Sequence, residues 1–443
     1  MQSAHRRNSR QLTRFFIPLA IQAASQALSY PLIAMVASRG PGGPLNLAGL
    51  AQATGIMIFL GMFCVSYVTT GMIYAVSREG YRKFRNVVLI TGLVVIAVQA
   101  ALCVPRLSQL LFANLMGLPP TIASPAKIAL LASIPVQFLF FLRTPYLVIM
   151  YIGRATAKAS LATLARIAVT AALSPLFCMM DLVGPIWALA CLTLPVALEC
   201  VTARVFADPF LKKLNPSTAT PPGASEIFFF NLPLSIGGYL LSASAVILGA
   251  FIARAPEPER VLPICYLALG LANPVAFAAT RIQTMVLAFP PASLKDRLTF
   301  RFALSAGAIL GLLPLIFIMP GLIELYYVTL QKLKPADLGL VRITVVALIF
   351  YPFSVAVRAQ SEGLAAWLKR PTTVMAGHMV FMTAFVVSGF ILVIWGAAGY
   401  VICGVVLPVG SLASSATMRA LMSRSRPKPI PVAPTTTSVG QVR

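Results

Sequence analysis

Long apolar runs alternate with short polar segments along most of the chain. A helix that crosses the hydrocarbon core of a membrane needs about 20 mostly apolar residues. Runs of that length lie at residues 12–38, 47–76, 86–104, 124–152, 157–179, 183–205, 228–252, 261–289, 299–319, 340–367, 372–394 and 397–420. The pattern predicts an all-α polytopic membrane protein with about 12 transmembrane helices. The first run is too long for the core of a signal peptide and lacks a small-residue cleavage site, so we expect it to be retained.

Composition points to the same class and excludes an ordinary soluble domain. Of the 443 residues, 58% are hydrophobic and 10% are charged, whereas roughly a quarter of the residues in soluble domains are charged. The net charge of +24 would by itself suggest a nucleic-acid partner. The Lys and Arg residues, however, lie in short clusters between apolar runs, which is typical of polytopic membrane proteins. We therefore expect membrane lipids as partners, and no nucleic acid.

Basic residues are distributed unequally between alternate loops. One set of loops, with the two ends of the chain, holds Arg6, Arg7, Arg10, Arg14, Arg78, Arg82, Lys83, Arg85, Arg154, Lys158, Arg204, Lys212, Lys213, Lys295, Arg297, Arg301, Lys369, Arg370 and the tail from Arg419. The other set holds Arg39, Arg106, Lys127, Arg254, Arg260, Lys332, Lys334 and Arg342. The bias is about threefold and, by the positive-inside rule, predicts that both termini are cytoplasmic. Short outer loops and a compact length favour a bacterial protein of the cytoplasmic (inner or plasma) membrane.

The chain divides into two halves. Residues 206–225 are rich in Pro, Ser and Thr and separate the sixth run from the seventh. We expect an N-terminal six-helix bundle over residues 1–205, a cytoplasmic linker over 206–227 and a C-terminal six-helix bundle over 228–421. Residues 422–443 are basic, Pro-rich and poor in apolar residues, so they are predicted to form a disordered tail.

The two halves resemble each other in sequence. PLAI at 18–21 matches PLSI at 233–236, and Arg39 matches Arg254, both at an offset of 215 positions. Arg143 and Arg358 are related by the same offset, and GLAQ at 49–52 matches GLAN at 270–273 after a short insertion. A repeat of six spans makes both halves enter the membrane in the same direction. We predict two pseudo-symmetric bundles around a central cavity, working by alternating access.

Charged side chains lie inside the predicted spans: Arg143, Arg166, Glu199, Arg281, Arg358 and Glu362. A charge at the centre of the bilayer costs at least about 2.5–3.5 kcal/mol, so its default interpretation is functional. Arg143, Arg281 and Arg358 lie far from the ends of their spans. Arg166 is closer to the basic residue Lys158, and we expect its side chain to snorkel to the cytoplasmic surface.

The sign of the deep charges constrains the substrate. Arg358 and Glu362 are spaced i, i+4, so Arg358 either pairs with Glu362 or forms one wall of an anion site. Arg143 and Arg281 have no acid at that spacing and need Glu199, backbone carbonyls, water or a ligand. A guanidinium suits carboxylate and phosphate groups. We therefore predict a small-molecule anionic substrate bound by Arg143, Arg281 and Arg358, with Glu362 beside them.

Other candidate residues are polar side chains within apolar runs. Gln52, Asn273 and Gln283 are predicted to line the cavity, and Glu199 and His378 are candidates for coupling to H⁺ or Na⁺. A single His in a helical bundle more often packs or forms a hydrogen bond. The seven cysteines all lie in apolar runs without a C-x-x-C pair, so we expect no metal site and no disulfide. No nucleotide-binding loop or nucleophile motif is present, and we expect no cofactor and no enzymatic activity.

Several segments carry a resemblance to a known family. Residues 340–374 resemble a segment of the progressive ankylosis protein family through Val355, Val357, Arg358, Ala359, Gly363, Trp367, Lys369, Arg370 and Thr372. RFFIPLAI at 14–21, ATRIQTMVLAFP at 279–290 and residues 396–418 are similar to its first, eighth and last spans, with Arg281 on the family's arginine. More distantly, the chain is similar to the multidrug-and-toxin-extrusion and lipid-flippase superfamily. Ser66 and Val68 stand where the ankylosis family carries an acidic and a basic residue.

The resemblance implies export of polyanions such as citrate, nucleoside triphosphates or pyrophosphate. Three alternatives stay open at this point. A multidrug antiporter for organic cations would need Glu199 or Glu362 in the cavity. A flippase for a lipid-linked phosphate or sugar would need a lateral opening, and a scaffold or receptor would bury every deep arginine in an ion pair.

Overall fold

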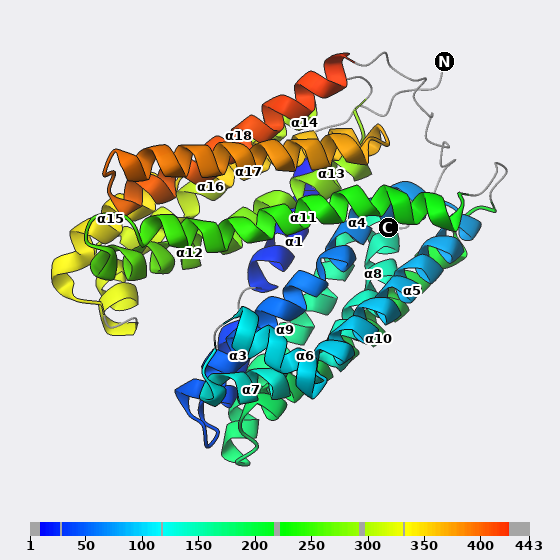
Figure 1. The fold of residues 1–443 in the computed structure, drawn as a ribbon. Helices are drawn as coiled ribbons and strands as arrows, with labels where there is room; N and C mark the ends of the chain where they lie inside the picture. The colour runs from blue at the N-terminus through cyan, green and yellow to red at the C-terminus, as the bar shows by residue number, and fades with distance from the viewer. Residues whose placement is uncertain are drawn as a thin grey trace.

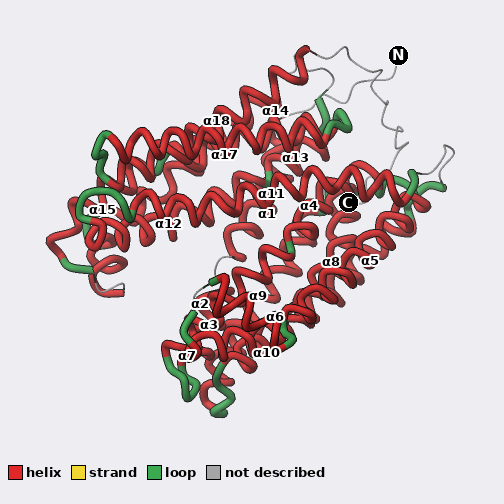
Figure 2. The backbone as a smooth tube through the Cα atoms, viewed as in Figure 1, coloured by secondary structure: helices red, strands yellow, loops and turns green. Residues whose placement is uncertain are grey.

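The computed structural model describes residues 9–26, 29–116, 118–216, 222–291, 297–330 and 333–424. Over these residues the regular structure is helical, without a strand (Figure 2). The first half contains α1 (Ser9–Gln26), α2 (Ser29–Ser38), α3 (Pro44–Leu60), α4 (Met62–Tyr74), α5 (Arg78–Leu102), α6 (Pro105–Gln109), the π-helix η1 (Leu110–Leu115), α7 (Pro120–Ala132), α8 (Ile134–Ile152), α9 (Thr156–Met179) and α10 (Pro185–Lys212).

The second half is also built from helices and short irregular turns. It contains α11 (Ala224–Ile252), α12 (Pro258–Thr280), α13 (Ile282–Ala288), α14 (Leu298–Leu312), η2 (Leu313–Ile318), η3 (Glu324–Leu330), η4 (Pro335–Asp337), α15 (Leu338–Ala347), α16 (Phe350–Trp367), α17 (Pro371–Ile394) and α18 (Gly399–Arg424). Of the η elements, η2 and η4 are 3₁₀ helices and η3 is a π-helix.

The described residues form 11 helices that are long and apolar enough to cross a membrane. They are Leu45–Tyr74, Arg78–Leu102, Pro120–Ile152, Thr156–Met179, Pro185–Lys212, Ala224–Ile252, Ile264–Ala288, Leu298–Ile318, Pro335–Trp367, Pro371–Ile394 and Gly399–Arg424. They coincide with the second to twelfth predicted runs. The first run is occupied by α1 and α2, on either side of residues 27–28, which lie outside the described residues. The all-α polytopic prediction is confirmed, and 11 of the 12 predicted spans are found among the described residues.

Several spans are interrupted at positions that the sequence repeat relates. α3 gives way to α4 at Gly61, and α12 gives way to α13 at Arg281. The break residues Gly61 and Arg281 are 220 positions apart, which agrees within one residue with the 221-position offset between GLAQ and GLAN. α7 gives way to α8 at Ser133, and the corresponding residue Leu348, 215 positions later, follows the end of α15. The two halves therefore share their helix breaks as well as their sequence motifs.

Figure 1 shows the helices as two arms, one of α1–α10 and one of α11–α18, which diverge from a common contact region. Contacts between the arms lie at the end of the molecule where α5, α14 and α17 begin, which we call the basic end. Thr70 Oγ1 donates to Asn231 Oδ1 at 2.8 Å. The rings of Phe15 and Phe289 meet edge to face at 5.3 Å, and those of Tyr74 and Phe230 do so at 5.2 Å.

The buried apolar residues form three clusters that match this shape. The largest lies at the basic end and contains residues of both halves, such as Phe16, Tyr67, Ile282 and Val355. A second cluster consists of residues of the second half only, and the third of residues of the first half only. Burial of apolar surface is the main stabilising contribution to packing between such elements. The cluster at the basic end is thus shared by the two arms, whereas each of the other two clusters belongs to one arm.

Candidate functional site

A cavity of about 250 Å³ lies against the first arm and reaches the second arm at Arg281. Its polar lining consists of Gln22 and Gln26 of α1, Gln137, Arg143, Thr144 and Tyr151 of α8, and Arg281. Its apolar lining includes Met57, Ile58, Val65, Val68, Phe140 and Leu147. The helix breaks at Gly61 and Arg281 both border this cavity. The two interruptions therefore place Gly61 and Arg281 in the same cavity as Arg143.

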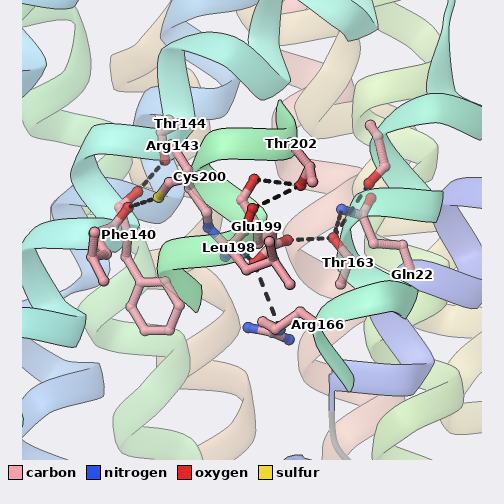
Figure 3. Close-up of polar contacts among 12 residues, drawn as sticks. Gln22, Phe140, Arg143, Thr144, Thr163, Arg166, Leu198, Glu199, Cys200 and Thr202 are labelled. Carbon is pink, nitrogen blue, oxygen red and sulfur yellow. Dashed lines mark hydrogen bonds and ion pairs between the residues drawn. The ribbon is translucent and has the colours of Figure 1, made fainter. Parts of the chain in front are cut away.

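Arg143 is held on the wall of the cavity by an ion pair with α10. Its Nη1 donates to Oε2 of Glu199 at 2.5 Å, as Figure 3 shows. Its guanidinium carbon lies 4.7 Å from the centre of the Phe140 ring, a cation–π contact. The side chain of Arg143 is 13% exposed, whereas that of Glu199 is fully buried. The cavity therefore meets the guanidinium, while the carboxylate lies behind it.

A chain of hydrogen bonds fixes the other oxygen of Glu199. Thr163 Oγ1 donates to Glu199 Oε1 at 2.5 Å, and Gln22 Nε2 donates to Thr163 Oγ1 at 2.7 Å. Tyr151 donates its hydroxyl to Gln22 Oε1 at 3.1 Å. This chain connects two cavity-lining residues, Gln22 and Tyr151, to the buried carboxylate. Such fully bonded polar networks hold their members in one geometry.

Arg166 adds a second guanidinium to the same carboxylate. Its Nε lies 3.6 Å from Oε2 of Glu199, and the residue is 3% exposed (Figure 3). The expectation that Arg166 snorkels to the surface is therefore wrong. The side chain points instead into the contact between α9 and α10, where Glu199 supplies the opposite charge that a buried guanidinium requires.

Arg281 differs from the other deep arginines because its charge is not balanced. Within the described residues it makes no ion pair, whereas Arg143, Arg166 and Arg358 each lie beside a glutamate. Its buried Nε has no hydrogen-bond partner, a feature that it shares with those three arginines. It borders the same cavity as Arg143. With Arg143 and Arg166 sharing Glu199, the three arginines and one glutamate carry a net charge of two positive units. The buried amide Nε2 of Gln137, also on the cavity, is a further donor without a partner.

The second half contains a related cluster that is sealed within the protein. Arg358 Nε lies 3.0 Å from Glu362 Oε1, so the pair expected from the i, i+4 spacing is formed. His378 Nε2 lies 2.8 Å from the same oxygen. Arg358, Glu362 and His378 are 8%, 7% and 4% exposed. Arg143 and Arg358 occupy equivalent positions of the repeat, and Thr163 and His378 do so as well, since both pairs are 215 positions apart.

The predicted site residues thus separate into three groups. Arg143 and Arg281 line the cavity, and Glu199 lies directly behind Arg143. Arg358, Glu362 and His378 form their own cluster and are not among the residues that line it. Gln52, Asn273 and Gln283 are half-buried and do not line it either.

The sequence reasoning missed Gln22, Gln137 and Tyr151. Each lies within an apolar run, as Gln52 and Asn273 do, so polarity alone did not separate the two groups. Among the described residues, no group of three His, Cys, Asp or Glu side chains is placed to hold a metal ion.

No family model matches the chain, and no curated protein matches it. Solved structures match along nearly its whole length. One is described as the outward-facing conformation of a multidrug resistance MATE family transporter of the MOP superfamily, with a TM-score of 0.74 and 15% identity over 93% of this chain and 94% of that chain.

Two further structures have the same architecture. A MOP superfamily transporter from Pyrococcus furiosus matches with a TM-score of 0.68 and 15% identity over 93% of this chain and 94% of that chain. The eukaryotic MATE transporter AtDTX14 matches with a TM-score of 0.67 and 15% identity over 94% of this chain and 96% of that chain. The chain therefore has the MATE transporter fold. No match supports the progressive ankylosis family specifically, and that resemblance stays a prediction from sequence.

Proposed function

We propose that this chain is a membrane transporter that moves organic or phosphorylated anions by alternating access between its two arms. The moving units are residues 1–205 and 228–421, joined by the linker 206–227. The similarity to the fold of MATE family transporters supports a transport role. The contact between the arms at the basic end supports alternating access, because that contact must open for the cavity to face the other side.

The observation that carries the anionic substrate is the unbalanced charge of Arg281. Arg143 and Arg281 both border the cavity, and no Asp or Glu is among the residues that line it. The guanidinium forks suit a carboxylate or a phosphate, and the unpartnered amide of Gln137 adds a neutral donor. The apolar walls formed by Val65 and Leu147 favour an anion with an apolar portion.

The resemblance to the progressive ankylosis family points in the same direction. It implies citrate, nucleotide or pyrophosphate-like polyanions, and Arg281 is one of the residues that carry the resemblance. These compounds are therefore the first ones to test, followed by anions with a larger apolar portion.

A MATE-type multidrug antiporter for organic cations is the second candidate, favoured by the similarity to the multidrug resistance transporter. A cation site needs an acid that is free to meet the substrate. Glu199 is fully buried behind Arg143, and Glu362 is bonded to Arg358 and His378. The Pyrococcus furiosus transporter is described as having a pocket of reverse polarity that suggests a different function. An anion-binding member of this fold would be consistent with that description.

We also propose that both termini lie in the cytoplasm of a bacterial cell and that the protein resides in its inner membrane. The basic loops support this orientation through the positive-inside rule. The closed basic end would then face the cytoplasm, so the arms would diverge toward the outside.

The proposed function is tested by metabolite profiling of the medium of cells that express the protein. Arg281→Ala and Arg281→Lys are compared at matched expression with Arg301→Ala, which removes an exposed arginine of α14. One charge-assisted hydrogen bond contributes about 1.5–3 kcal/mol, so Arg281→Ala should lower export of the anion about tenfold or more. Arg281→Lys should retain part of it, and Arg301→Ala should not change it.

The profile also distinguishes the two candidates. Accumulation of citrate, nucleotides or other anions outside only the cells with intact Arg281 supports the anion transporter. An unchanged medium, together with resistance to cationic dyes that survives Arg281→Ala, would instead establish the multidrug antiporter.

A further inference from the structure

The imidazole of His378 is bonded on one side only. Its Nε2 lies 2.8 Å from Glu362 Oε1, and in the tautomer that carries its hydrogen on Nε2 this nitrogen donates to the carboxylate. Its Nδ1 is buried and has no hydrogen-bond partner among the described residues. The residue against this face is Gly237 of α11. A Cβ added to Gly237 would lie 2.2 Å from Nδ1 and 3.1 Å from Cε1. The neutral ring fits this space because glycine leaves room for it.

α11 is positioned between the His378 cluster and the other arm. It packs on α17, which carries His378, and on α4 of the first half. While Gly237 faces His378, the next residue faces α4, since a Cβ on Gly238 would lie 3.5 Å from Sδ of Met62. About two turns earlier on the same helix, Asn231 accepts from Thr70 at 2.8 Å and donates to the carbonyl of Phe63 at 3.5 Å. A displacement of α11 at Gly237 would therefore reach the contact that closes the basic end through the helix itself.

We propose that His378 is a proton-binding switch whose protonation displaces α11 and opens the contact between the two arms at the basic end. A protonated imidazole carries N–H donors on both nitrogens. The new Nδ1–H would point at the backbone of α11 with no acceptor, and a buried donor without a partner is unfavourable. The proton-bound form consequently favours a conformation in which α11 has moved and Nδ1 has found water or another acceptor.

The charges around His378 are few and can be named. α16 contributes Arg358 and Glu362, which neutralise each other, so a proton on His378 adds an unbalanced positive charge. α18 contributes Ser411, which accepts from Arg358 at 3.4 Å. Arg419 of α18 lies further along and is bonded to Ser361 and Gln360. The charged residue of α11 is Glu226, in its first turn at the basic end. Glu362 is thus the alternative proton acceptor that a test must separate from His378.

The sign of the pH dependence follows from linkage. If the proton binds more tightly to the open form than to the closed form, lowering the pH raises the open population. For one proton, the ratio of open to closed molecules changes by at most about tenfold per pH unit. The switch can be tested without knowledge of the substrate. The protein could therefore transport anions without this switch, or have the switch and transport another substrate.

The test is hydrogen–deuterium exchange of the full-length protein in detergent, corrected for the intrinsic pH dependence of exchange. When the pH is lowered from about 8 to about 5.5, exchange in peptides covering Thr70 and Asn231 should rise about tenfold or more. His378→Gln keeps an amide donor toward Glu362 and should abolish the rise. His5→Gln removes the other histidine of the chain and should leave the rise unchanged.

Two outcomes would overturn the proposal. One is a rise that persists in His378→Gln and disappears in Glu362→Gln, which would assign the proton to the carboxylate. The other is an unchanged exchange rate in the wild type across this pH range. Gly237→Ala provides a second measurement, because the added methyl presses on Nδ1 at every pH. Gly237→Ala should exchange fast at pH 8, and acidification should not increase its exchange further. Slow exchange at pH 8 with a normal rise on acidification in this variant would also reject the switch.

Discussion

The two halves build the same arginine into different surroundings. In the first half, Arg143 meets the cavity, and its carboxylate Glu199 comes from another helix, α10. In the second half, Arg358 is sealed, and its carboxylate Glu362 comes from the same helix, four residues away. The repeat has kept the backbone frame and the guanidinium while the acid has moved. We infer that one copy of the motif was free to bind a ligand and the other to respond to protons.

Near the two arginines, the larger side chain of a packed pair lies on a different helix in each half. Gln22 and Thr163 pack together in the first half, and the residues 215 positions later are Gly237 and His378. A large residue on the first helix of one half is matched by a large residue on the fifth helix of the other. Close packing explains this difference, because a protein interior tolerates substitutions that conserve the total side-chain volume better than substitutions that increase it. Only the second arrangement contains an imidazole, which can bind a proton on its second nitrogen.

The largest difference between the halves should follow from removing the two carboxylates. Glu199→Gln leaves Arg143 and Arg166 buried without an anion, and breaking a buried pair in this way costs about 3–5 kcal/mol. Glu362→Gln leaves one guanidinium, which keeps Ser411 at 3.4 Å and the ring of Phe381 at 5.3 Å. We expect a smaller loss there, about 1–3 kcal/mol. Thermal unfolding in detergent, monitored by fluorescence, gives the order, and equal losses would contradict the comparison.

Replacing the Gly237–His378 pair by the Gln–Thr pair of the first half should recover the stability that Gly237→Gln alone removes. Gly237→Gln places a long side chain against His378 and should destabilise the protein by about 1–3 kcal/mol through overpacking. The double variant Gly237→Gln with His378→Thr reproduces the first-half pair and should recover most of that loss. Unfolding of the two single variants and the double variant forms a mutant cycle. Additive effects would mean that the two positions are not a packing unit.

The contact between the arms should be weaker than either buried cluster. Thr70→Val preserves shape but removes the hydroxyl that donates to Asn231. The amide nitrogen of Asn231 keeps Ser235 and the carbonyl of Phe63 as acceptors. Its buried Oδ1 loses the hydroxyl of Thr70, so the loss should be about 1–2 kcal/mol. Hydrogen exchange around Asn231 should rise while that of α17 stays unchanged. Thr383→Val, which removes a hydroxyl bonded within its own helix, is the control.

The smallest effects are expected at a pair of polar residues that the repeat also relates. Gln52 and Asn273 are half-buried and do not line the cavity. Alanine at either position should change stability by about 0.5 kcal/mol or less and transport by no more than about twofold. Transport of the identified anion by the two variants, beside Arg281→Ala, checks this. A tenfold loss at either position would extend the substrate site beyond the residues that line the cavity.

The fold was predictable from sequence because its strongest signal is local. An apolar run of sufficient length has one stable form in a membrane, a helix, so runs two to twelve were predicted correctly. The pairing of Arg358 with Glu362 was one of two arrangements that the sequence left open, since four residues of helix bring the two side chains to one face.

The sequence did not predict which side of each helix faces the cavity, or which side chains pair between different helices. Arg166 was assigned to the surface because Lys158 is near in sequence, yet Glu199 of α10 holds it inside. Gln52 and Gln137 look alike in sequence, and only Gln137 lines the cavity. Which side of an apolar helix meets a cavity depends on how the arms pack, and no residue of the helix itself encodes it.

The shared apolar cluster at the basic end has a consequence for how the protein is made. Phe15, Phe16 and Tyr67 of the first half pack with residues such as Ile282 and Phe302, which are synthesised more than two hundred residues later. Until the second half has been synthesised, the first arm therefore lies in the membrane without some of the residues that pack against its apolar cluster. Residues 1–216 expressed alone should be degraded or bound by membrane chaperones, and co-expression of residues 217–443 should rescue them. Folding of this protein would then be completed only when its second half has packed against the first.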